Sequence, residues 1–185
     1  MVDRILEALS WLPNELYVFV ISMLPVVELR GAVPIGALLL DMPFYTNFTV
    51  SAFGNMLPIP FILLFVPKVL DFLAKFKIFR PMVEWLHRKA EKNRTKIIRE
   101  DNLKTANAEE GVGKIRMSTA VFVALMLFVA LPVPGTGAWT GALVASLFDL
   151  PKKQSFLSIL LGVVICGVIM CLASYGVLGF LSFLI

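Results

Sequence analysis

The residues best suited to chemistry are a carboxylate and a guanidinium that stand two positions apart in a very apolar stretch. Glu28 and Arg30 lie within residues 25–40, and no other residue of that range is charged. A charge at the centre of a bilayer costs ~2.5–3.5 kcal/mol even on lenient insertion scales. Arginine suits phosphate because its planar fork donates two hydrogen bonds at once, and a carboxylate can carry a proton. We predict anion binding by Arg30 and proton coupling by Glu28. The alternative is a buried ion pair that only holds the chain together.

A second stretch, PVPGTGAWTG at residues 132–141, is also rich in helix breakers and precedes an apolar run. A helix that begins there points free N–H groups and the positive end of its dipole back at the loop, which favours an anion. Small residues let backbone amides approach a ligand closely. We therefore predict one substrate-binding set for an anionic group such as phosphate: Arg30, Gly31, Gly135, Thr136 and Gly137.

A polar stripe follows the first of these stretches. Asn47, Ser51 and Asn55 are spaced i, i+4 and i+8, so they share one face of a helix. This face is predicted either to line a substrate path, as part of the substrate-binding set, or to bind a neighbouring helix.

The elements that position these residues belong to a membrane protein. Hydrophobic residues make up 58% of the 185, and only 16% are charged, whereas about 25% are charged in soluble domains. Two stretches, after Asp41 and after Asp149, are apolar over the length needed to cross a bilayer of ~30 Å. The predicted fold class is an all-α integral membrane protein.

Charge is concentrated in one loop. Thirteen of the 17 Lys and Arg lie between Lys68 and Arg116, against seven acids. Such an excess marks cytoplasmic loops, so residues 68–116 are predicted to face the cytoplasm, in part as an amphipathic helix on anionic lipid headgroups. Nucleic acid is not expected as a partner, because no stacking aromatics are interleaved with the basic residues. Residues 1–11 are predicted to lie on the membrane surface.

The two halves of the chain share the pattern D-x-P-x4-F-x5-G, shifted by a constant 108 residues. This indicates an internal duplication, with repeats over residues 12–67 and 117–185. The matched residues are Asp41, Pro43, Phe48 and Gly54 in the first half and Asp149, Pro151, Phe156 and Gly162 in the second.

Each half holds two short apolar runs around a tip rich in Pro and Gly, then a D-x-P turn and a long apolar run. In the first half the tip is predicted to be unwound and to cover residues 25–31. Two short helices around such a tip predict a re-entrant hairpin, which is tolerated at membrane depth where protein or a wet cavity buries it. The charge rule then gives the halves opposite orientations, and inverted repeats with broken helices are typical of transporters. The rival model makes residues 14–40 and 117–148 full spans. Two hairpins and about two full spans are few helices to enclose a transport path, so a homodimer is also predicted.

Several chemistries are not expected. The single histidine, His87, lies in the basic loop, so neither a Ser-His-Asp set nor a histidine metal site is available. Cys166 and Cys171 have no metal spacing and are predicted to pack in the core. We expect no enzyme activity, no metal and no cofactor.

The stretches ELRGAVPIGALLL and PVPGTGAWTGALVASLF resemble the small multidrug export protein family of bacteria and archaea. The arrangement is also similar to the DedA superfamily, whose members carry two re-entrant hairpins facing each other. That resemblance implies recycling of lipid carriers such as undecaprenyl phosphate in a prokaryotic cytoplasmic membrane. Pro25–Glu28 resembles the acidic first-hairpin motif, and Gly135 stands in the second-hairpin motif. The chain departs from that pattern by having Thr136 and Gly137 where an arginine would stand.

Three functions are consistent with these patterns. The first is a proton-linked transporter that moves an amphiphile with an anionic headgroup, such as a polyprenyl phosphate, between leaflets. The second is a proton-coupled exporter of small cationic compounds, with Glu28 as the shared site. The third is a structural membrane subunit without cargo.

Overall fold

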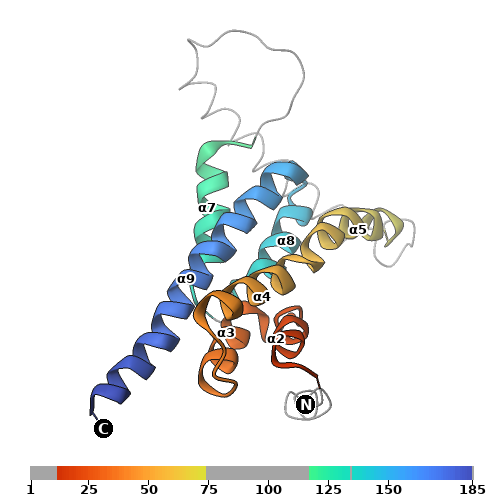
Figure 1. Ribbon diagram of the computed structural model, residues 1–185. Helices are drawn as coiled ribbons and strands as arrows, with labels where there is room; N and C mark the ends of the chain where they lie inside the picture. Colours follow the sequence, from red (N-terminus) through yellow and green to blue (C-terminus); the bar gives the residue numbers. More distant parts are fainter. Residues whose placement is uncertain (1–11, 74–116, 134, 185) are drawn as a thin grey trace.

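The computed structural model describes residues 12–73, 117–133 and 135–184, and all regular structure in these ranges is helical. The predicted surface segment at residues 1–11 lies outside them, as does most of the predicted basic loop. Figure 1 shows α9 (Lys152–Leu184) running the length of the molecule. All the other described helices pack along it except the first, which packs on the two helices that follow it.

The first half folds as a helical hairpin followed by a long broken helix. Its two arms are α2 (Asn14–Ser22) and α3 (Glu28–Leu38). The Asn14 amide lies 3.5 Å from the carbonyl oxygen of Leu40, so the second arm ends beside the start of the first. The chain continues as α4 (Phe44–Met56) and α5 (Pro58–Leu73). The break falls at the proline, which cannot donate a hydrogen bond to the preceding turn.

The second half repeats this order. Its arms are α7 (Thr119–Ala130) and α8 (Ala138–Leu147), and α9 is the long helix that follows. The Met117 N–H donates to Gln154 Oε1 at 2.5 Å. The start of α7 therefore lies beside the start of α9. The hairpin of α7 and α8 thus begins and ends on the same side of the molecule.

The D-x-P pattern is a helix-ending turn in both halves. Asp41 and Asp149 have φ of 47° and 48°, the left-handed conformation that commonly ends helices. The prolines then start the long helices, because the carbonyls of Pro43 and Pro151 each accept an N–H four residues on at 2.9 Å. The motif found in the sequence therefore has the same backbone role twice.

The matched glycines also have equivalent places. A Cβ on Gly54 would lie 2.4 Å from the carbonyl oxygen of Phe19 on α2, and one on Gly162 would lie 2.7 Å from that of Met126 on α7. In each half the glycine lets the long helix approach the backbone of the first arm of its own hairpin. The repeat thus extends from the sequence pattern to the packing.

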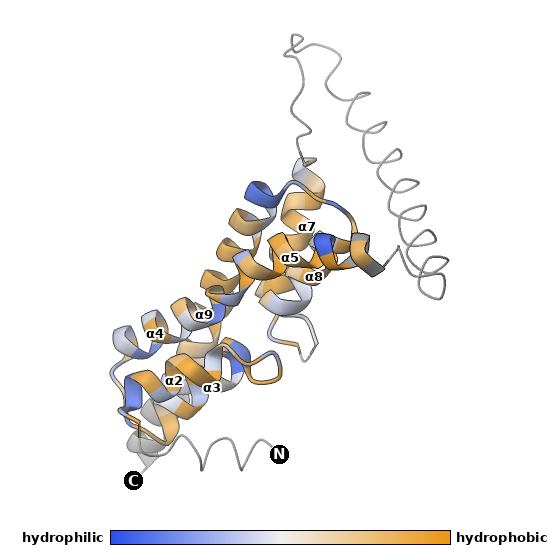
Figure 2. Cartoon of the chain, turned by 90° about the vertical axis from the view of Figure 1, so that its right-hand side faces the viewer, coloured by the Kyte–Doolittle hydropathy of each residue, from blue (hydrophilic) through white to orange (hydrophobic). Residues whose placement is uncertain are grey.

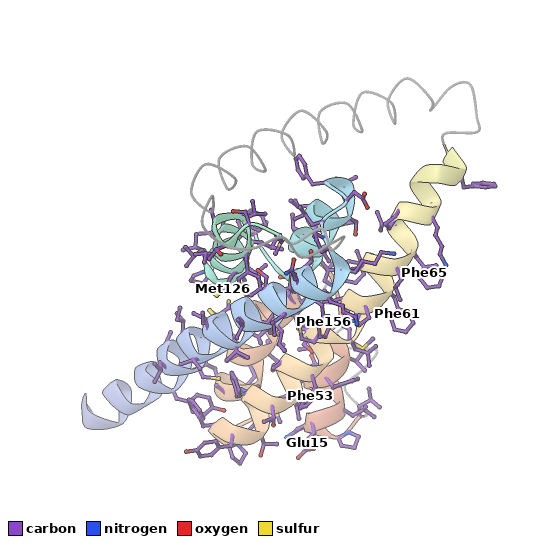
Figure 3. All side chains as sticks on the ribbon, turned by 90° about the horizontal axis from the view of Figure 1, so that it is seen from above. Glu15, Phe53, Phe61, Phe65, Met126 and Phe156 are labelled. Carbon is purple, nitrogen blue, oxygen red and sulfur yellow. The ribbon has the colours of Figure 1, made fainter. Side chains whose placement is uncertain are left out.

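Within the described ranges, two helical stretches are long and apolar enough to cross a membrane, Phe44–Val69 and Lys152–Gly176. Figure 2 shows apolar colour over most of α5, α7, α8 and α9. On α9 the exposed apolar side chains recur at helical spacing, and they include Leu157, Leu161, Val164, Val168 and Leu172. Phe61 and Phe65 project outward from α5 (Figure 3), with ring centroids 6.4 Å apart. A surface this apolar is suited to lipid rather than to water.

Buried side chains from both halves form one core along α9. Leu29, Ile59, Val129, Ile159 and Val163 are almost fully buried in one cluster. Cys166 and Cys171 are free thiols in the same cluster, which confirms the packing role predicted for them. The tips of the two hairpins, residues 23–27 and the described residues 131–133 and 135–137, lie against each other beside this core.

Candidate functional site

Glu28 and Arg30 lie in the first turn of a helix. Residues 25–31 were predicted to be an unwound tip, but α3 begins at Glu28 and runs through Gly31 and Pro34. The prediction was therefore wrong by about one turn. An acidic residue in the first turn of a helix is favourable because it faces the positive end of the dipole. The Glu28 backbone itself is left-handed, with φ of 50°, which stores on the order of 1–3 kcal/mol in a residue other than glycine.

The Glu28 carboxylate caps the N-terminus of α8 from the other hairpin. Glu28 Oε1 accepts the backbone N–H of Trp139 at 3.2 Å. Its Oε2 lies so close to Gly137, the N-cap residue of α8, that a Cβ there would fall 1.7 Å away. Glu28 is 7% exposed. Gly137 is therefore needed at this position to admit the carboxylate to the helix end.

Arg30 binds the end of α7 and the loop that joins α7 to α8. Its guanidinium donates to the carbonyl oxygens of Val133 and Thr136, to that of Val129 at 3.3 Å, and to Thr136 Oγ1 at 3.1 Å. Val129 is in the last turn of α7, where a cation is favoured by the negative end of the helix dipole. The guanidinium thus satisfies carbonyls that α7 and its following loop leave without a helical partner.

Trp139 completes the contact in the other direction. Its indole Nε1–H donates to the carbonyl oxygen of Met23 at 3.0 Å, and Met23 is the C-cap residue of α2. Arg30 of the first hairpin therefore donates to the end of α7, and Trp139 of the second hairpin donates to the end of α2. We call this set of contacts, made by Met23, Glu28, Arg30, Thr136, Gly137 and Trp139, the tip junction.

The two charges do not pair with each other as the sequence allowed. Among the described residues no ion pair joins Glu28 to Arg30, and each finds its partners on the second hairpin. The reason is geometric, because residues two apart on a helix do not face each other. A carboxylate and a guanidinium at this spacing can instead reach the two ends of one loop, the start of α8 and the end of α7.

The predicted anion-binding residues separate into two groups. Arg30, Thr136 and Gly137 meet at the tip junction together with Glu28. Gly135 does not, because it is exposed with φ of 87° and has nothing near the position of a Cβ. Gly31 packs against the Val27 side chain, where a Cβ would lie 2.6 Å from Cγ1. Of the anion-binding set, the structure thus brings together three residues.

The predicted polar stripe also divides. Asn47 is fully buried and donates to the carbonyl of Val33 at 2.9 Å and to the Tyr175 hydroxyl at 3.2 Å. Ser51 is fully buried and donates to Asn47 Oδ1 at 3.2 Å. These contacts tie α4 to α3 and α9, which favours helix packing over a path for both residues.

Asn55 differs from the other two. It is 3% exposed, and its Oδ1 accepts no hydrogen bond from the described residues. It lines a cavity of about 10 Å³ beside the tip junction, about the room that one water molecule needs. The other lining residues are Glu28, Leu29, Arg30, Val129, Gly137, Ala138, Val163 and Cys166.

Two members of the site were missed from the sequence. Trp139 was given no role in the breaker-rich stretch at residues 132–141, although a tryptophan two residues after Gly137 in the first turn of a helix carries two N–H donors. Cys166 lines the cavity, and nothing in its sequence context indicates this. No cluster that could hold a metal ion occurs among the residues described.

Comparison with known proteins identifies a family. A family model described as "Putative small multi-drug export protein" matches residues 28–169, a range that covers more than half of the chain and begins at Glu28. No curated protein and no solved structure matches the chain. The similarity to the DedA superfamily stays a prediction.

Proposed function

The chain belongs to the small multidrug export protein family, and from this premise we propose that the tip junction is the cargo site of a proton-linked membrane transporter. Family membership and two helices able to cross a bilayer make the chain a membrane protein of the export class. Its proposed cargo is an amphiphile with an anionic headgroup, such as a polyprenyl phosphate, carried between leaflets.

One observation carries the proposal: the anion site that the sequence indicates at the start of α8 holds a carboxylate, that of Glu28. A buried helix N-terminus that binds one carboxylate has the charge and the donors to bind another anion in its place. Arg30 lies beside it, and its planar fork suits a phosphate better than the separate carbonyls that it now binds. The junction is thus built as an anion site whose present occupant belongs to the protein.

Exchange of the two anions links cargo to protons. A protonated Glu28 loses the charge that holds it at the start of α8, because the dipole favours only an anion there. The headgroup then binds the α8 amides and Arg30 while Glu28 keeps its proton. When the site opens to the other side of the membrane, Glu28 releases the proton, returns to the start of α8 and displaces the headgroup. A headgroup and a proton move together in this scheme.

The proposed membrane arrangement is an inverted pair of re-entrant hairpins. An arm of 12 residues, the length of α7, reaches about 18 Å at 1.5 Å per residue, less than the ~30 Å hydrocarbon core. In Figure 1, α2 begins near the bottom of the view and α7 near the top, and the tips meet between them. Hairpins that enter from opposite sides would place the tip junction near the midplane, where transporters bind their substrates.

Sidedness and assembly are part of the same proposal. Lys152 and Lys153 are exposed at the start of α9, beside the start of α7 where the basic loop ends. We place this end of the molecule, with residues 68–116, in the cytoplasm of a prokaryotic cell. Two long helices enclose little space, so the working unit is proposed to be a homodimer. A mass of one chain by light scattering in mild detergent would contradict the dimer.

The alternative cargo is a small cationic compound, which the family description favours. Among the described residues Glu28 is the only acidic side chain that is buried, as a cation site would require. However, the carboxylate lies against the positive end of α8 and two residues from Arg30. Both of these positive groups oppose the binding of a cationic cargo. The geometry therefore favours the anionic cargo.

Proteoliposomes test the proposal directly. Transfer of a polyprenyl phosphate between leaflets should require protein and should be lost in Arg30→Ala, while Lys153→Ala, on the surface of α9, should leave it unchanged. Transfer of a cationic dye that needs Glu28 and not Arg30 would favour the alternative. If wild-type and Arg30→Ala protein are equally folded and both inactive toward either cargo, the transport proposal is wrong and a structural role is favoured.

A further inference from the structure

We propose that the cavity beside the tip junction binds one water molecule, which donates a hydrogen bond to Asn55 Oδ1 and brings the proton to the Glu28 carboxylate. The water site stands on the geometry alone, whereas its role in proton transfer rests on the proposed function. Asn55 would be a positioning residue, because it acts on Glu28 only through the water.

The first support is an unpartnered acceptor. Asn55 is 3% exposed, and its Oδ1 has no donor among the described residues. A buried acceptor left without a donor is destabilising, because it has given up its hydrogen bond to water. Asn47, on the same face of α4, shows the usual outcome, since its Oδ1 accepts from Ser51 at 3.2 Å. Asn55 lines a cavity instead, so the missing donor has room to be a solvent molecule.

The second support is the size and lining of the cavity. Its volume of about 10 Å³ matches the space that one water needs, and a buried water needs two to four polar partners. Asn55, Glu28 and Arg30 line it, and they supply an amide oxygen, a carboxylate and a guanidinium. The remaining walls are mostly apolar, which leaves these groups as the partners.

Water fits this cavity better than a metal cation. The Arg30 guanidinium lines the same space and repels a cation, and the Cys166 thiol, which also lines it, supplies no charge in its neutral form. Only two side chains, Asn55 and Glu28, offer oxygen ligands there. Water can donate to Asn55 and to the carboxylate, or accept from Arg30, without an added charge.

The role in proton transfer follows from where Glu28 is held. Its Oε1 is engaged by Trp139 and its Oε2 lies against Gly137, so protein covers the carboxylate on the α8 side. The cavity borders the same side chain and is the opening through which a proton donor can reach it. A single water in contact with both Asn55 and Glu28 would be the last member of such a path.

The test is infrared spectroscopy of the full-length protein in nanodiscs at acidic pH. The carboxyl C=O band that disappears in Glu28→Gln identifies protonated Glu28, and transfer to D2O follows its exchange. Asn55→Leu should slow the exchange by about tenfold or more. Cys171→Ser is the matched control, because Cys171 is also buried on α9 but does not line the cavity, and it should exchange within about twofold of wild type.

A second variant covers the case in which Asn55→Leu does not fold. Val163→Ile leaves Asn55 in place and fills the cavity, so it should also slow the exchange. Wild-type exchange in either folded variant would overturn the water site, and so would an exchange rate that changes when sodium replaces choline. Slow exchange in both variants together with absent lipid transfer by wild type would support the water site and contradict the cargo.

Discussion

Glu28 and Gly137, which are far apart in the sequence, are in direct contact: a Cβ at position 137 would fall 1.7 Å from Glu28 Oε2. The acidic group of the first hairpin occupies the helix start of the second, as a ligand would. This contact explains why a carboxylate, a guanidinium and helix breakers are placed in an apolar stretch. Glu28 and Arg30 bind the start of α8 and the end of α7, and thereby lock one tip onto the other.

The contact predicts that Gly137→Ala is destabilising. The added methyl group forces the carboxylate from the start of α8, and overpacking of this kind costs about 1–3 kcal/mol. Thermal unfolding in detergent should show the loss. Gly176→Ala is the matched control on α9, where a Cβ meets nothing within 4 Å, and it should unfold like the wild type. Equal unfolding of Gly137→Ala and the wild type would show that the carboxylate is not held at Gly137.

Trp139→Phe should weaken the tip junction without uncapping α8. The variant keeps the backbone N–H that binds Glu28 but loses the indole donor to the Met23 carbonyl. The loss of one such hydrogen bond costs about 0.5–1.5 kcal/mol. Denaturant or thermal unfolding should therefore shift modestly, while Phe53→Leu, on the exposed face of α4, should not shift. An unchanged Trp139→Phe would mean that the indole bond contributes nothing.

Cysteine labelling distinguishes hairpins from full spans. In a background with Cys166 and Cys171 replaced, single cysteines at Asn14 and Asp41 should react with a membrane-impermeant reagent from the same side. A cysteine at Lys152 should react only from the opposite side. The four-span model instead places positions 14 and 41 on different sides, so labelling from different sides would exclude the re-entrant first hairpin.

Much of the fold follows from local sequence signals. The D-x-P pattern predicts the turns at Asp41 and Asp149 because a left-handed residue followed closely by proline ends one helix and starts the next. The lengths of the apolar runs separate short arms from long helices. The start of α3 was misplaced because Gly31 and Pro34 look like breakers, whereas Pro34 lies inside α3, where it removes one backbone hydrogen bond without ending the helix.

The partners of the charged residues could not be read in the same way. Arg30 binds carbonyls about a hundred residues away. Every residue has a backbone carbonyl, so residue types do not identify these partners. The spacing of Asn47, Ser51 and Asn55 correctly placed them on one face. It could not show that Tyr175 would satisfy Asn47 while Asn55 borders a cavity, because that depends on how α3 and α9 pack.

The central claim is that the Glu28 carboxylate and an anionic headgroup compete for the start of α8. The most direct measurement is the affinity of purified protein for a short-chain polyprenyl phosphate as a function of pH, in wild type and Glu28→Gln. The account predicts wild-type binding that strengthens as the pH falls, because protonation removes the competing charge. Glu28→Gln, neutral at every pH, should bind tightly with little dependence on pH. Equal pH dependence in the two proteins, or weaker binding by Glu28→Gln, would contradict the competition.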